Sequence, residues 1–302
     1  MRRSIAKCLK LARITSWPSF SLSFVIIFAV GAYEGTSWAE ALVGFAALFI
    51  FAGFAFALNF YSDRESDIYH DGKEKEFDLS KQPLITGEVT ERECIAFCVV
   101  TFLTAVVLGF VVSNLFGLLM VSVCLVGGIL YSHPWIRLKA KPVVDIVCMA
   151  GMAAVLFSAG YALARGTMLN WPAFLFLYMF AAISHIPSVL YDYKYDAQAG
   201  LRTSAVVFGQ RNLAKAMWVL WLCILPLAWF IISEPYALGY KVAVVLGCAS
   251  LAIYTSTVWW SLRTPSQTVP LLTGHPRREI AFSSVVSLSF LCYACFKLFS
   301  AS

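Results

Sequence analysis

The stretch NFYSDRESD, residues 59–67, follows an apolar run from Leu42 to Leu58 and largely decides which fold this chain adopts. If the helix continues through the stretch, Asn59, Asp63 and Asp67 lie on one face, one turn apart. Like charges at this spacing repel each other, so an acidic pair kept at the end of an apolar helix indicates a bound cation. The stretch therefore predicts a metal site at the end of a membrane helix.

A second stretch, SVLYDYKYD at residues 188–196, repeats the pattern. Ser188, Asp192 and Asp196 occur at the same intervals and again end an apolar run. Each stretch alone is equally consistent with a solvated helix end that carries acids. The two together predict an oxygen-rich site for magnesium and, through the metal, for a diphosphate.

The composition excludes a soluble globular domain. Hydrophobic residues make up 60% of the 302 residues and charged residues 13%, and the mean hydropathy is +0.76. We predict an all-α integral membrane bundle, a single domain over residues 1–302, because apolar segments of about 20 residues are typical of helices that cross a bilayer. Nine such segments occur, and the first is expected to be a membrane helix and not a secretory signal: 17–33, 40–62, 93–113, 115–132, 143–164, 171–191, 213–233, 240–261 and 279–299.

The basic residues predict the orientation of this bundle. With nine spans, 20 of the 23 Lys and Arg residues fall on the side of the N-terminus, and Arg165, Lys241 and Lys297 fall on the other. Because cytoplasmic loops collect Lys and Arg, the N-terminus is predicted to be cytoplasmic. Both acidic stretches then lie on the cytoplasmic side. The polar loop between the second and third segments ends in Thr90 and Glu93, a predicted capping box for the next helix.

Several polar residues outside the acidic stretches are further candidates. The segment YSHPWIRLKAKP, residues 131–142, places Tyr131, Arg137 and Lys139 at the cytoplasmic interface, either as topology anchors or as ligands of a phosphate.

Asp145 opens the fifth apolar segment, where an acid is costly unless it is paired or faces a polar cavity. The alternatives are a local partner in Lys141 and a contact with substrate. His185 lies two helical turns before Asp192 and is either a satisfied core residue or a polar group of the site.

These motifs resemble those of the UbiA superfamily of intramembrane prenyltransferases. NFYSDRESD resembles the first aspartate motif of that family and DYKYDAQAG the second, while SKQPLITGE, YSHPWIRLK and TSAVVFG resemble the segments between and after them. The chain departs from the pattern at Phe60, where many members have Asp, and at Gln82, where many have Arg. Lys81 is expected to supply the missing cation. The stretch HIPSVLYDYKYDAQAG is similar to the carotenoid branch, typified by lycopene elongases.

The resemblance implies magnesium-dependent transfer of an isoprenoid group from an allylic diphosphate to a hydrophobic acceptor. It implies that Asp63, Asp67, Asp192 and Asp196 carry catalysis and, with Asn59, bind Mg²⁺. The substrate-binding residues that we expect are Lys81, Tyr131, Arg137, Lys139, Asp145, His185 and Ser188.

The expected partners are an isoprenyl diphosphate donor, a lipophilic acceptor and membrane lipid, with no nucleic acid. We expect a multi-pass protein of the cell inner membrane with its active site on the cytoplasmic side.

Three alternatives to transfer onto a carotenoid such as lycopene remain open. In the first, the acceptor is an aromatic quinone precursor; in the second, the protein is a membrane terpene cyclase in which the cation is captured by its own double bonds. The third, from another class of protein, is an ion-coupled transporter. A transporter is expected to place its acids near the bilayer midplane among broken helices, whereas these acids lie at helix ends.

Overall fold

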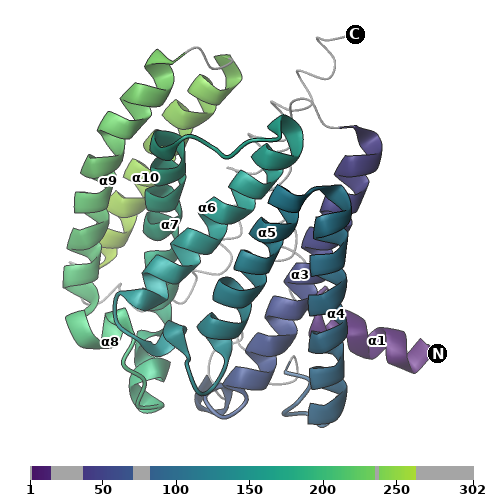
Figure 1. Ribbon diagram of the computed structural model, residues 1–302. Coiled ribbons are helices and arrows are strands. Elements are labelled where there is room, and N and C mark those ends of the chain that lie inside the picture. Colours follow the sequence, from purple (N-terminus) through teal and green to yellow (C-terminus); the bar gives the residue numbers. More distant parts are fainter. Residues whose placement is uncertain (1, 15–36, 71–81, 235–237, 263–302) are drawn as a thin grey trace. The chain divides into compact units, whose positions relative to one another are not determined.

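A computed structural model of the protein describes residues 2–14, 37–70, 82–234 and 238–262, and all regular structure in these ranges is helical (Figure 1). The predicted all-α class is therefore confirmed for the described residues. The elements are α1 (Arg2–Leu11), α3 (Trp38–Asp63), the 3₁₀ helix η1 (Asp67–His70), α4 (Glu91–Val112), α5 (Asn114–Ser122), the π-helix η3 (Val123–Leu130), the 3₁₀ helix η4 (Leu138–Ala140), α6 (Val144–Arg165), α7 (Trp171–Gln198), α8 (Ser204–Phe208), α9 (Gln210–Ser233) and α10 (Leu238–Ser261).

Seven of the nine predicted membrane segments are helical. Five helices are long and apolar enough to cross a membrane, namely those over Ala39–Asp63, Glu91–Val112, Val144–Arg165, Trp171–Leu190 and Gln210–Ser233. Shorter apolar helices occupy Asn114–Leu130 and Val244–Trp259. The first and last predicted segments, 17–33 and 279–299, lie outside the described residues, so the count of nine spans and the orientation stay predictions.

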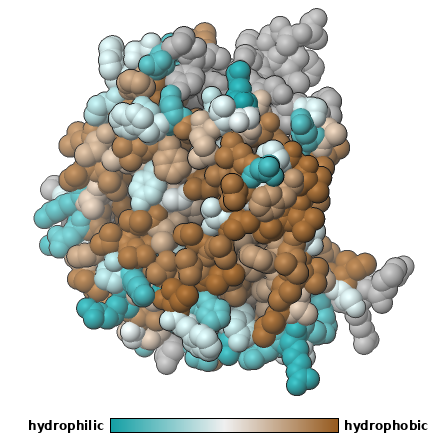
Figure 2. Space-filling view, in the orientation of Figure 1, coloured by the Kyte–Doolittle hydropathy of each residue, from teal (hydrophilic) through white to brown (hydrophobic). Residues whose placement is uncertain are grey.

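The surface of these helices is suited to lipid. Figure 2 shows extended hydrophobic areas on the face in view, and large apolar side chains such as Val111, Leu222 and Trp229 are exposed. A soluble protein rarely exposes contiguous apolar area on this scale, so the surface agrees with an integral membrane protein.

The chain forms two compact units. The first comprises Met1–Lys139 and Val155–Met168, and the second comprises Ala140–Ala154 and Leu169–Ser302. In the first unit α3 packs along α4, and α1, α5 and η3 complete the packing. In the second unit α9 packs against both α7 and α10, and the Trp221 indole donates a hydrogen bond to the Cys248 carbonyl at 3.0 Å.

The helix starts follow from local sequence. Thr90 caps α4, and Glu93 returns a hydrogen bond to the Thr90 backbone, so the capping box predicted from the sequence is confirmed. Ser37 and Glu40 form the same arrangement at the start of α3. Each box satisfies backbone N–H groups that a helix start leaves without partners.

The basic N-terminus is a helix, which the sequence analysis did not predict. The lysines of α1 bind acids near the start of α4: Lys7 Nζ lies 2.6 Å from Glu93 Oε1, and Lys10 pairs with Glu88. Leu11 is buried, and α1 contacts α3. These contacts fix the segment that leads to Arg13.

A close approach within the first unit generates a stability prediction. Gly128 in η3 lies against the ring of Phe54, and a Cβ at residue 128 would collide with that ring. Phe54 is 3% exposed and packs edge-on against Phe102, with ring centroids 5.6 Å apart, so the ring has little room to move. We expect Gly128→Ala to lower the free energy of unfolding by about 1–3 kcal/mol, measured by thermal unfolding in detergent.

Gly151→Ala in α6 is the matched control. A Cβ there would lie 3.7 Å from the Tyr178 ring, an ordinary contact. Because alanine favours a helix over glycine by up to about 1 kcal/mol, this variant should be neutral or more stable. Equal stability of the two variants would contradict the close packing of η3 on α3.

Candidate active site

The first acidic motif lies at the end of α3, with one difference from the expected geometry. Asn59 and Asp63 share a face of the helix, but α3 ends at Asp63, and Asp67 begins η1 after a turn. Side chains take the last helix carbonyls: Ser66 Oγ donates to the Asp63 carbonyl at 3.1 Å and Arg64 Nη1 to the Tyr61 carbonyl at 2.7 Å. The prediction of one continuous helical face through Asp67 was therefore wrong, because α3 ends before that residue.

Asp63 is bound by the two cations that the sequence analysis singled out. Arg137 Nη2 lies 3.1 Å from Asp63 Oδ1, and Lys139 Nζ lies 2.6 Å from Asp63 Oδ2. Arg137 Nη2 also donates to Ser66 Oγ at 3.0 Å. Arg137 adopts a left-handed backbone with φ 41°, which is uncommon for a residue with a side chain.

The segment that carries these cations is anchored to α3. Ser62, which is buried, donates a hydrogen bond to the Ser132 carbonyl. Tyr131, next to Ser132, is half-buried at the same end of the first unit. Burial lowers the pKa of Lys139, and the charge and hydrogen bond of Asp63 oppose that shift.

Arg13 is a third cation at this site, and the sequence analysis missed it. Its Nη2 donates to Asn59 Oδ1 at 2.8 Å, and its guanidinium lies 4.4 Å from the centroid of the Phe60 ring and 5.1 Å from that of Phe56. Such cation–π contacts hold a guanidinium in an apolar environment. The only sequence signal was its place as the last basic residue before the first apolar segment.

Asp67 is buried and bound by Gln82. The Gln82 amide donates to Asp67 Oδ2 and to the Phe60 carbonyl, each at 3.0 Å, and Gln82 is 1% exposed. Burial and the negative charge of Asp63 raise the pKa of Asp67 to about 7. Gln82 is thus a neutral neighbour of the acid at a position where many members of the resembling family have Arg. Lys81, expected to compensate, lies outside the described residues.

The residues of this motif fit a divalent cation. Two carboxylates and an amide oxygen are the hard oxygen donors that magnesium takes, and a bound cation would offset the burial and the Asp63 charge that raise the pKa of Asp67. Within the described ranges, no three side chains of His, Cys, Asp or Glu lie close enough together to form a site by themselves. Water or substrate oxygens would therefore complete the coordination, as is usual for magnesium.

The second motif lies in the last turns of α7, which continues to Gln198, so Asp192 and Asp196 occupy one helical face as predicted. Both are half-buried. Thr203 Oγ1 donates to Asp196 Oδ2 at 2.9 Å. Ser188 is half-buried one turn before Asp192.

His185 lies deeper in the same helix, beside Pro187, which has no N–H for the helix ladder. The His185 Nε2 atom is buried and has no hydrogen-bond partner among the described residues. A buried nitrogen of this kind is costly unless another group binds it, which favours the interpretation of His185 as a polar group of the site over that of a satisfied core residue.

Asp145 is 2% exposed, and its carboxylate is bound by Ser204. Its Oδ2 accepts from the Ser204 N–H at 2.8 Å, and its Oδ1 accepts from the Ser204 hydroxyl. No ion pair joins it to Lys141, although both residues are described. The local partner considered from the sequence is therefore replaced by a residue 59 positions away.

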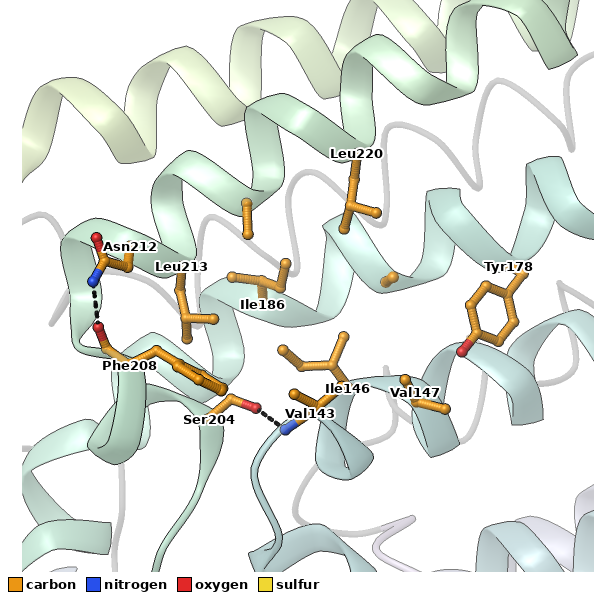
Figure 3. A pocket seen from close by; sticks show the side chains of 12 residues that line it. Val143, Ile146, Val147, Tyr178, Ile186, Ser204, Phe208, Asn212, Leu213 and Leu220 are labelled. Atoms are coloured by element: carbon orange, nitrogen blue, oxygen red, sulfur yellow. Dashed lines mark hydrogen bonds between the residues drawn. The ribbon is translucent and has the colours of Figure 1, made fainter.

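The second unit also contains an apolar pocket of about 400 Å³ between α6, α7, α8 and α9 (Figure 3). Aliphatic side chains such as Ile146, Ile186 and Leu220 dominate its wall, and Tyr178 and Ser204 add hydroxyl groups. Asp145, His185 and Ser188, which we expected to line an apolar chamber, are not among the described residues that line this pocket.

These features define a polytopic α-helical membrane protein with acidic sites at its helix ends. The chain belongs to the UbiA prenyltransferase family, which it matches over residues 16–272. The resemblance drawn from the motifs is thereby confirmed, and the protein is a prenyltransferase and not a transporter. The assignment to the carotenoid branch stays a prediction.

Solved and curated relatives agree with this family. A UbiA homolog from Archaeoglobus fulgidus bound to GPP and Mg²⁺ is 27% identical, with a TM-score of 0.77 over 96% of this chain and 99% of that chain. The same homolog bound to DMAPP and Mg²⁺ gives 28% identity, a TM-score of 0.76 and coverage of 93% and 99%. A digeranylgeranylglyceryl phosphate synthase from Methanosphaera stadtmanae is 19% identical over 191 residues, which are 63% of this chain and 66% of that relative.

Proposed function

We propose that this protein transfers an isoprenyl group from an allylic diphosphate to a hydrophobic acceptor in the membrane. The observation that carries the proposal is the first acidic motif, where the Asp63 carboxylate lies within 3.1 Å of both Arg137 and Lys139. Arg13 is bound to Asn59 in the same motif. Carboxylates for a metal beside cations for phosphate oxygens are the combination that a metal–diphosphate substrate requires.

The donor class is supported by the relatives. The Archaeoglobus fulgidus homolog has been solved with GPP and Mg²⁺ and with DMAPP and Mg²⁺. We infer that this chain likewise requires Mg²⁺ and an allylic diphosphate. The ligands that we propose for the metal are Asn59, Asp63, Asp67, Asp192 and Asp196.

The mechanism follows from charge. When bound by these residues, magnesium would supply positive charge to offset the negative charge that develops on the leaving diphosphate. Arg137, Lys139 and Arg13 bind phosphate oxygens and hold the donor in place. The rings of Phe56 and Phe60 exclude water near Arg13. Exclusion of water protects the allylic cation until the acceptor captures it.

The acceptor is proposed to be uncharged near its reacting carbon. In the second unit, Lys194, Arg202, Arg211 and Lys215 are all exposed, so none of these four is placed to bind an acidic head group in an apolar chamber. His185 and Ser188 offer neutral polar groups instead. We propose a carotenoid such as lycopene, with His185 as a partner of the acceptor and Asp192 and Asp196 near the cytoplasmic face of the membrane.

The metal role of the aspartates predicts a large loss of activity. Asp63→Asn, Asp67→Asn, Asp192→Asn and Asp196→Asn should each lower kcat/KM by about 10²-fold or more, because each removes negative charge that binds magnesium. Chelation of Mg²⁺ should abolish transfer, and added Mg²⁺ should restore it. The assay follows isoprenyl transfer from geranylgeranyl diphosphate by purified protein.

Glu65→Gln is the control within the same motif. The Glu65 side chain is 88% exposed, so its neutralisation should leave kcat/KM within about twofold of the wild type. Full activity of the Asp63 and Asp67 variants, or transfer in the presence of excess chelator, would contradict the metal role.

The phosphate role of Arg137 predicts a selective effect on the donor. Arg137→Gln should raise the KM of the diphosphate about tenfold or more, because a charge-assisted hydrogen bond contributes about 1.5–3 kcal/mol. The KM of the acceptor should change little. Arg92→Gln is the control, since Arg92 is an exposed cation in the first turn of α4, outside the acidic motif. A donor KM that moves equally in both variants would return Arg137 to an anchoring role.

The acceptor is decided by product analysis. In a host that makes lycopene and geranylgeranyl diphosphate, we expect carotenoids whose mass has increased by one or two isoprenyl groups. The same host supplied with a hydroxylated aromatic acid, or with geranylgeranylglyceryl phosphate, should yield no prenylated product. Unmodified lycopene beside a prenylated aromatic acid or glyceryl phosphate would overturn the carotenoid proposal, and a cyclic hydrocarbon formed from the donor alone would indicate a cyclase.

A further inference from the structure

The short helix α8 begins in an unusual way. Thr203 occupies its N-cap position, where a threonine hydroxyl ordinarily accepts a hydrogen bond from the first turn. The Thr203 side chain makes no such bond. Its hydroxyl instead donates to Asp196 Oδ2 at 2.9 Å, so a residue in the capping position is used to hold an acid of the second motif.

Asp145 provides the cap that Thr203 does not. Its Oδ2 accepts from the N–H of Ser204, the first residue of α8, at 2.8 Å. Its Oδ1 accepts from the Ser204 hydroxyl and from the Ile146 N–H, the latter at 2.9 Å. A carboxylate at a helix start satisfies an N–H and has favourable electrostatics with the helix dipole.

The backbone beside Asp145 is strained in the same place. Val143 has φ 71°, which a β-branched residue rarely adopts, and its N–H donates to Ser204 Oγ at 2.7 Å (Figure 3). A conformation of this kind costs about 1–3 kcal/mol and persists only where surrounding contacts enforce it. Ser204 thus binds the start of α6 through both Val143 and Asp145.

We propose that Asp145 and Ser204 are positioning residues that fix the first turn of α8 so that Thr203 orients the carboxylate of Asp196. The inference rests on the proposed function, in which Asp196 is a magnesium ligand. Hydrogen bonds to ligating groups set their orientation, and their loss typically weakens metal binding about 10–100-fold. Asp145 therefore acts on the metal site through Ser204 and Thr203 and does not contact the acceptor.

The burial of Asp145 supports this role over substrate contact. Asp145 is 2% exposed, and its carboxylate already accepts three hydrogen bonds, two from Ser204 and one from the Ile146 N–H. A substrate that took one of these oxygens would leave a buried donor without a partner, which costs about 1–3 kcal/mol.

The first test compares two substitutions at residue 203. Thr203→Val keeps the shape and removes the hydroxyl, whereas Thr203→Ser keeps the hydroxyl. The apparent dissociation constant of Mg²⁺, called the Mg²⁺ constant below, is measured on the full chain in two assays. The first follows the rise in unfolding temperature during an Mg²⁺ titration with geranyl diphosphate and no acceptor, and the second follows transfer activity. Thr203→Val should raise this constant about tenfold in both assays, and Thr203→Ser should restore it.

Thr255→Val is the matched control for Thr203→Val. Thr255 is 1% exposed in α10, and its hydroxyl has no hydrogen-bond partner among the described residues. The substitution removes a buried hydroxyl from the same unit but far along the chain from α8. It should leave the Mg²⁺ constant unchanged.

The second test separates positioning from acceptor contact. Asp145→Asn should raise the Mg²⁺ constant several-fold and leave the acceptor KM unchanged. Ser204→Ala should act in the same direction and provides the answer if Asp145→Asn does not fold. A raised acceptor KM with an unchanged Mg²⁺ constant would overturn the proposal, as would wild-type Mg²⁺ binding in Thr203→Val.

Asp196→Asn distinguishes this failure from failure of the proposed function. If Asp196→Asn weakens Mg²⁺ binding while the variants at residues 145, 203 and 204 do not, the positioning role is wrong and the metal role stands. If Asp196→Asn binds Mg²⁺ like the wild type, the proposed function itself is wrong at this residue.

Discussion

The placement of two neighbouring carboxylates at the end of α3, Asp67 buried and Asp63 half-buried, is the constraint on which the first unit depends. Burial and the negative charge of Asp63 both raise the pKa of Asp67. The groups that offset the cost of placing two carboxylates here come from distant parts of the sequence. Arg137 and Lys139 bind Asp63, Gln82 binds Asp67, and Arg13 binds Asn59. Bringing these residues to one helix end requires α1, the segment around Gln82 and the segment after η3 to converge there.

The sequence was sufficient to predict helices and site residues where the pattern was local or occurred twice in the chain. The spacing of Asp192 and Asp196 predicted their shared helical face, Thr90 and Glu93 predicted the start of α4, and apolar segments predicted seven helices within the described ranges. Arg137 and Lys139 were recognised because a cluster of cations beside acidic motifs suits phosphate binding. The predictions of the helices needed only residues within a few positions of one another, and the cation cluster was recognised by its combination with the two acidic motifs.

The sequence failed where a residue's partner lies far along the chain. Nothing near Arg13 in the sequence indicated its partner Asn59, so Arg13 was counted only as a topology signal. Nothing near Asp145 indicated Ser204, so the partner of Asp145 was expected to be Lys141 or the substrate. Gln82 was noticed only as a departure from a family pattern, although it is the hydrogen-bond partner of Asp67. Asp67 itself lies beyond the end of α3, in η1, and so is not on the helical face that its spacing predicted.

The attachment of α1 has a practical consequence for recombinant forms of this enzyme. Lys7 and Lys10 bind α1 to acids near the start of α4, and the chain then delivers Arg13 to Asn59. Foreign residues fused to the N-terminus therefore begin one short helix away from the acidic site. A form whose translation starts after Arg13 would keep every predicted membrane segment and still lack one of the cations of that site. Good expression of such a form would therefore say little about its catalytic activity.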